Sequence, residues 1–151
     1  MDAVVDSSSL ISLAWAGLLG LLERSPLRAV VPQEVRRETV AQGLARGYPD
    51  AAAIESVVAR LPTTGSGQVE DVDEAVLGLA RAKGTLLTND VALGRRASNL
   101  GVRWLRSADV VVLCVREGRL DREAGLGALA ALHGAGRITD ALLGEYSEEL
   151  S

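Results

Sequence analysis

The stretch Ala3-Val4-Val5-Asp6-Ser7-Ser8-Ser9-Leu10-Ile11 near the start of the chain is the one from which we predict the fold. Its three leading apolar residues, two of them β-branched, are typical of a short buried strand. The serines after Asp6 are good N-caps for a helical pattern that begins at Leu10. Because chemistry in an open α/β sheet takes place at the carboxyl ends of the strands, Asp6 stands where a catalytic carboxylate would lie.

Apolar runs and helical patterns alternate along the rest of the chain. We predict strands at residues 3–5, 27–31, 85–88 and 102–105. We predict helices over residues 10–22, 32–40, 50–61, 71–83 and 91–100, and a loop over 62–68. Pro32 suits a first helical position, and Asp71 suits an N-cap, with Glu74 reaching back to it. This alternation predicts a three-layer α/β fold with a parallel sheet of four or five strands, flanked by helices.

The chain is expected to form one domain over its 151 residues, a length that buries a sizeable core. The alternating core covers residues 1–106, and a helical tail of three helices follows over 107–151, with N-caps at Asp121 and Thr139. The net charge of −4 and the scarcity of aromatic residues exclude nucleic-acid binding that relies on stacking or on the protein's charge alone. Bound cations would change that balance.

The single cysteine and the lack of a long apolar segment indicate the cellular compartment in which we expect the protein. Cys114 lies in an apolar run, excludes an intramolecular disulfide and is expected to be a buried thiol in a reducing compartment. No segment reaches the ~20 apolar residues of a membrane span, and no basic region precedes an apolar one at the N-terminus. We therefore expect a cytoplasmic protein.

Acidic residues follow the predicted strands at the same edge of the sheet. Asp6 and Asp90 end strands, Asp73 lies in the first turn of a helix, and Glu34 or Glu38 lies on the helix after Pro32. Clustered carboxylates repel one another, so they favour a divalent cation such as Mg²⁺, which can support phosphodiester cleavage. Each acid also has a structural interpretation as a helix cap or dipole partner, strongest for Asp71, Glu74 and Glu34.

Other catalytic arrangements have less support. The chain's one histidine, His133, lies in the helical tail and suits a helix end, so a Ser-His-acid triad is not indicated. The segment Thr64-Gly65-Ser66-Gly67 lacks the lysine and spacing of a phosphate loop. Arg95 and Arg96 could contact a nucleic-acid backbone or form a solvated helix face.

Several of these segments together resemble the PIN-domain ribonucleases, particularly the VapC-like toxins of toxin–antitoxin pairs. The matching segments are Val4-Val5-Asp6-Ser7-Ser8, Val31-Pro32-Gln33-Glu34-Val35-Arg36-Arg37-Glu38, Asp73-Glu74-Ala75-Val76-Leu77-Gly78-Leu79-Ala80 and Leu86-Leu87-Thr88-Asn89-Asp90. The resemblance implies that Asp6, Glu38, Asp73 and Asp90 bind the metal and act in catalysis. It implies that Ser8 and Thr88 orient acids or water, although hydrogen bonding in turns and caps explains these two equally well.

The function implied by the resemblance is a metal-dependent endoribonuclease that uses Mg²⁺ or Mn²⁺ on an RNA substrate and has an antitoxin protein as partner. The alternative is a catalytically inactive PIN-like module for protein interaction. The leucines of the tail could serve an antitoxin, pack on the sheet or form a homodimer; they are Leu126, Leu129, Leu132, Leu142 and Leu143. Glu34, in the first turn of its helix, is expected to interact with the helix dipole rather than with metal.

Overall fold

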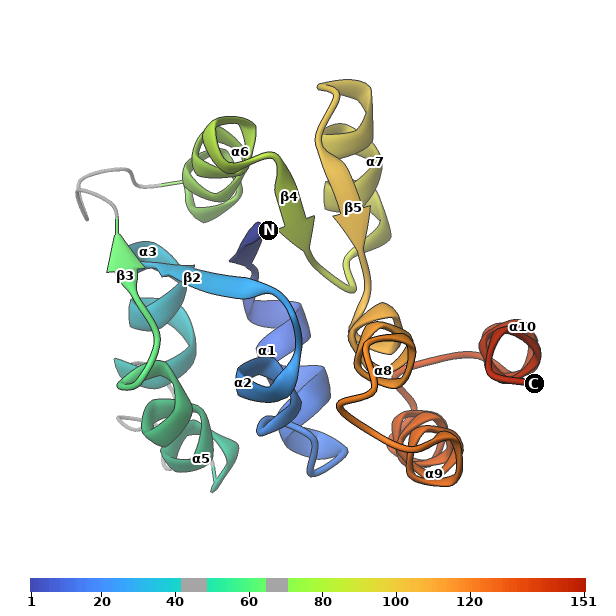
Figure 1. The fold of residues 1–151 in the computed structure, drawn as a ribbon. Coiled ribbons are helices and arrows are strands. Elements are labelled where there is room, and N and C mark those ends of the chain that lie inside the picture. The colour runs from blue at the N-terminus through green and yellow to red at the C-terminus, as the bar shows by residue number, and fades with distance from the viewer. Residues whose placement is uncertain (42–48, 65–70) are drawn as a thin grey trace.

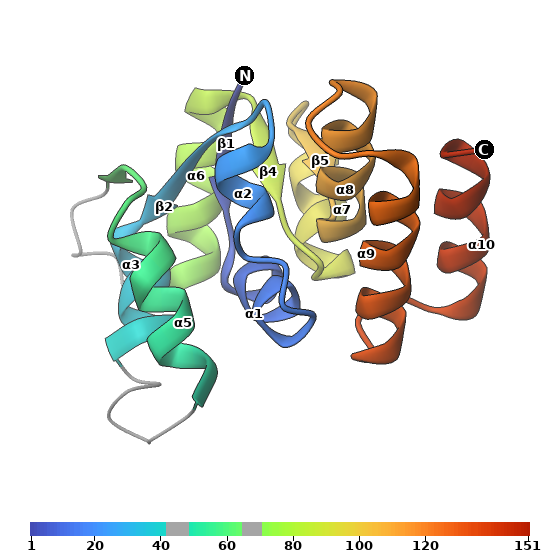
Figure 2. The same cartoon turned by 60° about the horizontal axis from the view of Figure 1, so that its bottom comes forward.

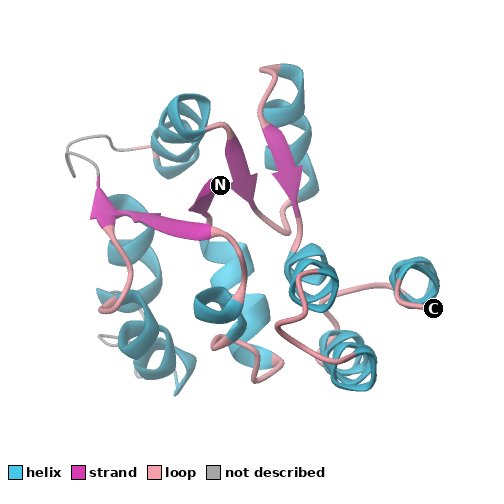
Figure 3. Ribbon diagram, viewed as in Figure 1, coloured by secondary structure: helices cyan, strands magenta, loops and turns pink. Residues whose placement is uncertain are grey.

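The computed structural model describes residues 1–41, 49–64 and 71–151, which build a parallel sheet between layers of helices (Figures 1 and 3). The five strands lie in the order β3-β2-β1-β4-β5, and every neighbouring pair is parallel. Their bounds are β1 Asp2–Val5, β2 Arg28–Pro32, β3 Thr63–Thr64, β4 Thr85–Leu87 and β5 Arg103–Leu105. The predicted α/β fold is thus confirmed, and the sheet has five strands.

The central strand is β1, which pairs on both sides. Val4 lies opposite Val30 of β2 and opposite Leu86 of β4, and it is fully buried. Ala3, Val4 and Val5 of β1 are all buried and apolar, as in a strand that is covered on both faces, which is why its sequence shows no alternation.

The edge strand β3 was missed in the sequence. Residues 62–68 were predicted to form a loop, but Thr63–Thr64 pair with Val31–Pro32 of β2. A two-residue strand has no periodicity of its own, and its pairing depends on a partner some thirty positions away. The rest of the predicted loop, 65–68, lies outside the described residues.

Helices cover both faces of the sheet. Their bounds are α1 Ser7–Trp15, α2 Leu21–Arg24, α3 Gln33–Arg36, the π-helix η1 Arg37–Ala41, α5 Pro49–Val58, α6 Val72–Lys83, α7 Val91–Asn99, α8 Ser107–Arg116, α9 Arg122–Gly134 and α10 Asp140–Glu149. Helices α6 and α7 lie on one face, and α1, α2, α5 and α8 lie on the other (Figure 1). Helices α9 and α10 extend this second layer beyond α8 (Figure 2).

The predicted helix over 10–22 is wrong in its extent. Helix α1 begins earlier, at Ser7, and ends at Trp15. Gly17 then takes a left-handed φ of 72°, which glycine adopts at little cost. The N–H of Leu18 donates back to the Leu13 carbonyl at 2.7 Å, so the turn closes as a helix C-cap. The chain resumes helical structure only at α2.

Two further helix starts differ from the prediction by small shifts. Pro32 is the last residue of β2 and the N-cap of α3, with extended backbone (ψ 146°), rather than the first helical residue. Asp50 lies in the first turn of α5, which begins at Pro49, rather than at the cap. Its carboxylate accepts a hydrogen bond from Trp15 Nε1 at 3.2 Å, so it joins α5 to the end of α1.

The predicted N-caps at Asp71, Asp121 and Thr139 are confirmed. The side chain of each accepts a hydrogen bond from the backbone N–H three residues later, at 2.7–3.2 Å. The reciprocal half of the capping box at Asp71 is wrong, because the Glu74 carboxylate forms an ion pair with Arg96 instead. Tertiary contact between α6 and α7 therefore redirects this side chain.

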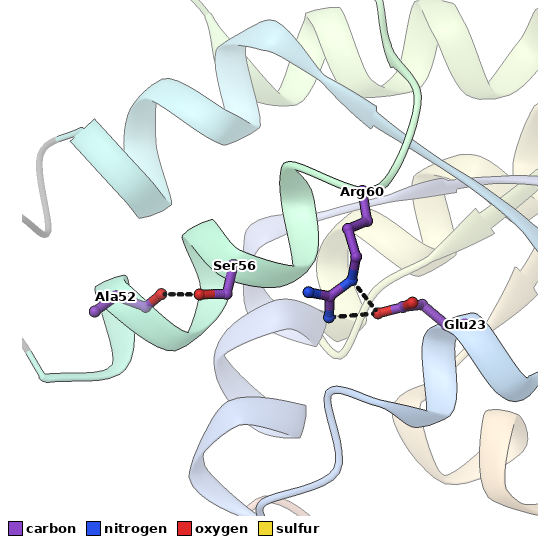
Figure 4. A network of polar contacts seen from close by, with 4 residues as sticks. All are labelled: Glu23, Ala52, Ser56 and Arg60. Carbon is purple, nitrogen blue, oxygen red and sulfur yellow. Dashed lines mark hydrogen bonds and ion pairs between the residues drawn. The ribbon is translucent and has the colours of Figure 1, made fainter.

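A polar contact on the surface joins α5 to α2 (Figure 4). Arg60, just after α5, donates from Nε and Nη2 to one carboxylate oxygen of Glu23, at 3.0 and 2.7 Å. Within α5, the Ser56 hydroxyl donates to the Ala52 carbonyl at 3.2 Å. The ion pair is exposed, so it contributes little to stability.

The helical tail packs as part of the same hydrophobic core as the sheet. Leu129 and Leu132 are fully buried, and Leu126, Leu142 and Leu143 pack partly buried against the core. Of the options for these leucines, packing inside the chain is therefore the one that the structure shows. Cys114 is buried, as predicted. In the described ranges, no helix is long and apolar enough to cross a bilayer.

Candidate functional site

Asp6 lies at the carboxyl end of the central strand β1. Its backbone N–H donates to the Leu87 carbonyl at 2.9 Å, so the ladder with β4 extends to the acid itself. The residue is only 4% exposed. Burial of a carboxylate costs free energy unless hydrogen-bond donors surround it, and two neighbouring hydroxyls supply such donors.

Ser8 and Thr88 hold the Asp6 side chain. Ser8 Oγ donates to Asp6 Oδ2 at 3.0 Å, and Thr88 Oγ1 donates to the same oxygen at 2.8 Å. Each hydroxyl also accepts a backbone N–H, from Asn89 at 2.9 Å and from Asp90 at 3.1 Å. The two hydroxyl oxygens also lie 3.0 Å apart, so Ser8, Thr88 and Asp6 form one hydrogen-bonded cluster. A role of Ser8 and Thr88 in catalysis stays a prediction.

Asp90 follows β4 and is the N-cap of α7. One carboxylate oxygen accepts the Leu93 N–H at 3.1 Å. The side chain is exposed, and the N-terminal end of a helix favours its negative charge. Asp90 is therefore a helix cap, as the structural interpretation predicted, and it also lies at the same sheet edge as Asp6.

Asp73 brings a third acid to this edge from the first turn of α6. Partial burial raises its pKa, and the nearby carboxylates of Asp6, Asp90 and Asp71 raise it further, while Arg96 lowers it. Repulsion of this kind requires that the carboxylates lie within interaction distance of one another. The carboxylates of Asp6 and Asp90 therefore lie within electrostatic range of Asp73.

The two glutamates after β2 lie in different environments. Glu34, in the first turn of α3, is 3% exposed, whereas Glu38, on the π-helix η1, is exposed. Neither is among the groups that shift the pKa of Asp73. The assignment of Glu38 to the metal and to catalysis stays a prediction. The simple dipole role expected for Glu34 does not account for its burial.

The donor set at this edge fits a hard divalent cation. Carboxylate oxygens are the protein ligands that Mg²⁺ and Mn²⁺ favour, and a cation would relieve the repulsion that raises the pKa of Asp73. As the side chains stand in the described ranges, no three acids are gathered closely enough to hold one ion.

Asn89 is a part of the site that the sequence analysis missed. Its amide Nδ2 donates to Ser12 Oγ at 2.9 Å, and its Oδ1 accepts from the backbone N–H and the hydroxyl of Ser107 at 2.8 and 3.0 Å. Asn89 thus joins the end of β4 to α1 and to the start of α8. Its place between Thr88 and Asp90 was the only signal in the sequence, because its partners are distant along the chain.

The remaining candidates lie outside the acidic edge. His133 lies in the last turn of α9, as predicted, and pairs with Asp140 at the start of α10. Arg96 forms the ion pair with Glu74 and lies near Asp73, while Arg95 is exposed on the same helix. The helix face with Arg95 and Arg96 is thus partly engaged in pairing between α6 and α7.

Comparisons with known proteins agree with this architecture. A PilT N-terminus domain protein from the hyperthermophilic archaeon Sulfolobus solfataricus P2 has a similar structure, with a TM-score of 0.51 and 16% sequence identity over 80% of this chain and 95% of that one. At this identity the likeness shows the fold alone. No curated protein matches the chain in sequence. A family model described as DUF3368, PIN domain, matches residues 2–149. The chain, with its acids at the carboxyl edge of a parallel sheet, therefore belongs to the PIN-domain family.

Proposed function

We propose that this protein is a metal-dependent endoribonuclease. PIN domains are generally nucleases, and the observation that carries the proposal is the position of Asp6 and Asp90 directly after the paired parallel strands β1 and β4, with Asp73 in electrostatic range of both. These acids come from three separate elements, β1, α6 and the junction of β4 with α7. Helix capping alone explains the position of an acid at Asp90. It explains neither the burial of Asp6 nor the electrostatic repulsion that helps to raise the pKa of Asp73.

In this proposal Asp6, Asp73 and Asp90, with Glu38, would hold Mg²⁺ or Mn²⁺. A bound ion would supply an activated water and offset the charge that builds on the phosphate. Ser8 and Thr88 keep the Asp6 carboxylate in one orientation by donating to Oδ2. The reaction is in-line hydrolysis, in which a P–O bond to the water oxygen forms as the P–O bond to one ribose breaks.

The test is cleavage of assorted RNAs by the purified protein with Mg²⁺ or Mn²⁺ and with a chelator. We expect Asp6→Asn, Asp73→Asn and Asp90→Asn to lose cleavage, because each removes a charge that the ion requires. Asp121→Asn is the matched control, since Asp121 caps α9 and asparagine caps helices equally well. Cleavage that survives exhaustive chelation, or full activity of Asp90→Asn, would overturn the proposal.

A second candidate, a catalytically inactive PIN-like interaction module, is favoured by one observation. In the described ranges no three acids stand closely enough to hold one ion. Such a module would not cleave RNA in any divalent ion, whether or not Asp73 is replaced by asparagine. The same assay therefore separates the two candidates.

The finer proposal is that the ribonuclease is the toxin of a toxin–antitoxin pair. It is supported by the resemblance of the acidic segments to the VapC-like toxins. An antitoxin would be expected to co-purify from the native host and to suppress the cleavage. A preparation that contains only homodimer or monomer and is fully active would count against it.

A further inference from the structure

A pocket of about 230 Å³ opens beside the acidic edge, next to Asn89 and the first residue of α7. Two arginines line it: Arg106, between β5 and α8, and Arg137, between α9 and α10. Asn89 also connects the pocket to the proposed catalytic site, because its backbone N–H donates to Ser8 Oγ, which donates to Asp6. None of the functions considered above uses these two side chains.

Arg137 is held in place by contacts of its own. Its Nε donates to Ser12 Oγ at 2.8 Å, and its Cζ lies 5.0 Å from the centroid of the Trp15 ring. Ser12 Oγ also accepts from Asn89 Nδ2, so Arg137 is connected to the site by two hydrogen bonds. Among the described residues, no carboxylate forms an ion pair with its guanidinium.

Arg106 is positioned in a similar way on the other side of the pocket. Its Cζ lies 4.3 Å from the centroid of the Trp104 ring. Trp104 is itself fixed, because its Nε1 donates to the Thr88 carbonyl at 3.0 Å. No described carboxylate forms an ion pair with the Arg106 side chain either.

Three helices begin around the pocket. Its lining includes the first residue of α7, Val91, and the N-caps of α8 and α10, Arg106 and Thr139. The N-terminal end of each helix carries partial positive charge. Each of these helix ends also carries an acidic side chain, Asp90, Asp109 or Asp140, so the two guanidiniums are the groups of the pocket that favour an anion.

We propose that Arg106 and Arg137 bind a backbone phosphate of the RNA next to the one that is cleaved. This inference rests on the proposed function and names the part of the site that positions the substrate. The planar guanidinium binds phosphate oxygens through two parallel hydrogen bonds. Both arginines are already ordered against a tryptophan ring, so less side-chain entropy is lost on binding.

The experiment measures binding of a short fluorescein-labelled oligouridylate by fluorescence anisotropy in EDTA, where cleavage is not required. Arg137→Gln and Arg106→Gln are each expected to weaken binding about tenfold, the usual effect of losing one charged hydrogen-bonded contact. The slope of log affinity against log salt should fall by about 0.7 for each lost phosphate contact.

The matched control is Arg103→Gln, which removes the same charge at the start of β5, the opposite end of that strand from Arg106. Its affinity should change less than twofold. Ser12→Ala keeps both arginines but removes the acceptor of Arg137 Nε, and an intermediate loss is expected. Far-UV circular dichroism verifies that each variant is folded.

The outcomes distinguish this inference from the proposed function. The inference is overturned if Arg106→Gln and Arg137→Gln bind RNA as tightly as the control does, even if the wild-type protein cleaves RNA. The pocket would then be assigned to another anion, such as an acidic protein segment. Wild-type protein that neither binds nor cleaves RNA would overturn both. If the arginine variants bind RNA more weakly but the wild-type protein shows no metal-dependent cleavage, RNA binding at the pocket is supported and the proposed nuclease activity is not.

Discussion

Asp73 is the residue whose ionisation responds most directly to the other acids of the site. Its pKa is raised above the ordinary value of 3.8 by partial burial and by neighbouring carboxylates. The Asp73 carboxyl therefore keeps its proton to a higher pH in the folded protein than in the unfolded chain. As pH rises through the window just above 3.8, ionisation of Asp73 consequently lowers the free energy of unfolding.

From this linkage we expect Asp73→Asn, measured without divalent ions, to gain stability relative to wild type between pH 3 and pH 7. At the acidic end, where Asp73 is protonated in both states, the two proteins should differ least. Urea unfolding at a series of pH values tests this. A variant whose relative stability falls as pH rises would contradict a raised pKa of Asp73 in the folded protein.

Glu34 and Glu38 should separate stability from activity. Glu34 is buried in α3, so Glu34→Gln is expected to cost about 1–3 kcal/mol of unfolding free energy, because a buried charged group loses its favourable interactions. This exceeds the 0.3–1 kcal/mol of a helix-end charge.

Glu38 is exposed, so Glu38→Gln should change stability by under about 0.5 kcal/mol, yet it should impair cleavage. The reverse pattern in paired unfolding and cleavage measurements would refute the assignment.

At the scale of elements, the contact between α7 and β5 depends on a glycine. A Cβ at Gly94 would overlap the ring of Trp104, whereas a Cβ at Gly78 on α6 meets nothing within 4 Å. Gly94→Ala is expected to cost about 1–3 kcal/mol through overpacking. Gly78→Ala should add about 0.5–1 kcal/mol, because alanine is the better helix former. Equal effects of the two substitutions in chemical denaturation would contradict this difference in packing.

At the scale of the whole molecule, the proposed ion would connect three elements that are distant in sequence. Binding to the folded chain alone stabilises it by mass action. With Mn²⁺ or Mg²⁺ at about 100 times its Kd, the melting temperature should rise by about 5–10 °C. Asp90→Asn keeps its helix cap but should lose most of this rise. An equal rise in the variant, or one reproduced by KCl at equal ionic strength, would argue against a site at these acids.

Local chemistry in the sequence was sufficient for much of the fold. The apolar run before Asp6 predicts a buried strand, and Asp71, Asp121 and Thr139 predict helix starts, because strand formation and capping depend on neighbouring residues. The order of strands and acids also places Asp6 and Asp90 at one edge, since parallel strands end together.

Only the tertiary structure decided the contacts between residues far apart in the chain. The two-residue strand β3, the burial of Glu34 and the ion pair of Glu74 with Arg96 each depend on a distant partner or on packing. The same is true of Arg137, which reaches Ser12 across most of the chain. Local propensity carries no information on such pairs, because their free energy arises only once the sheet and helices have packed.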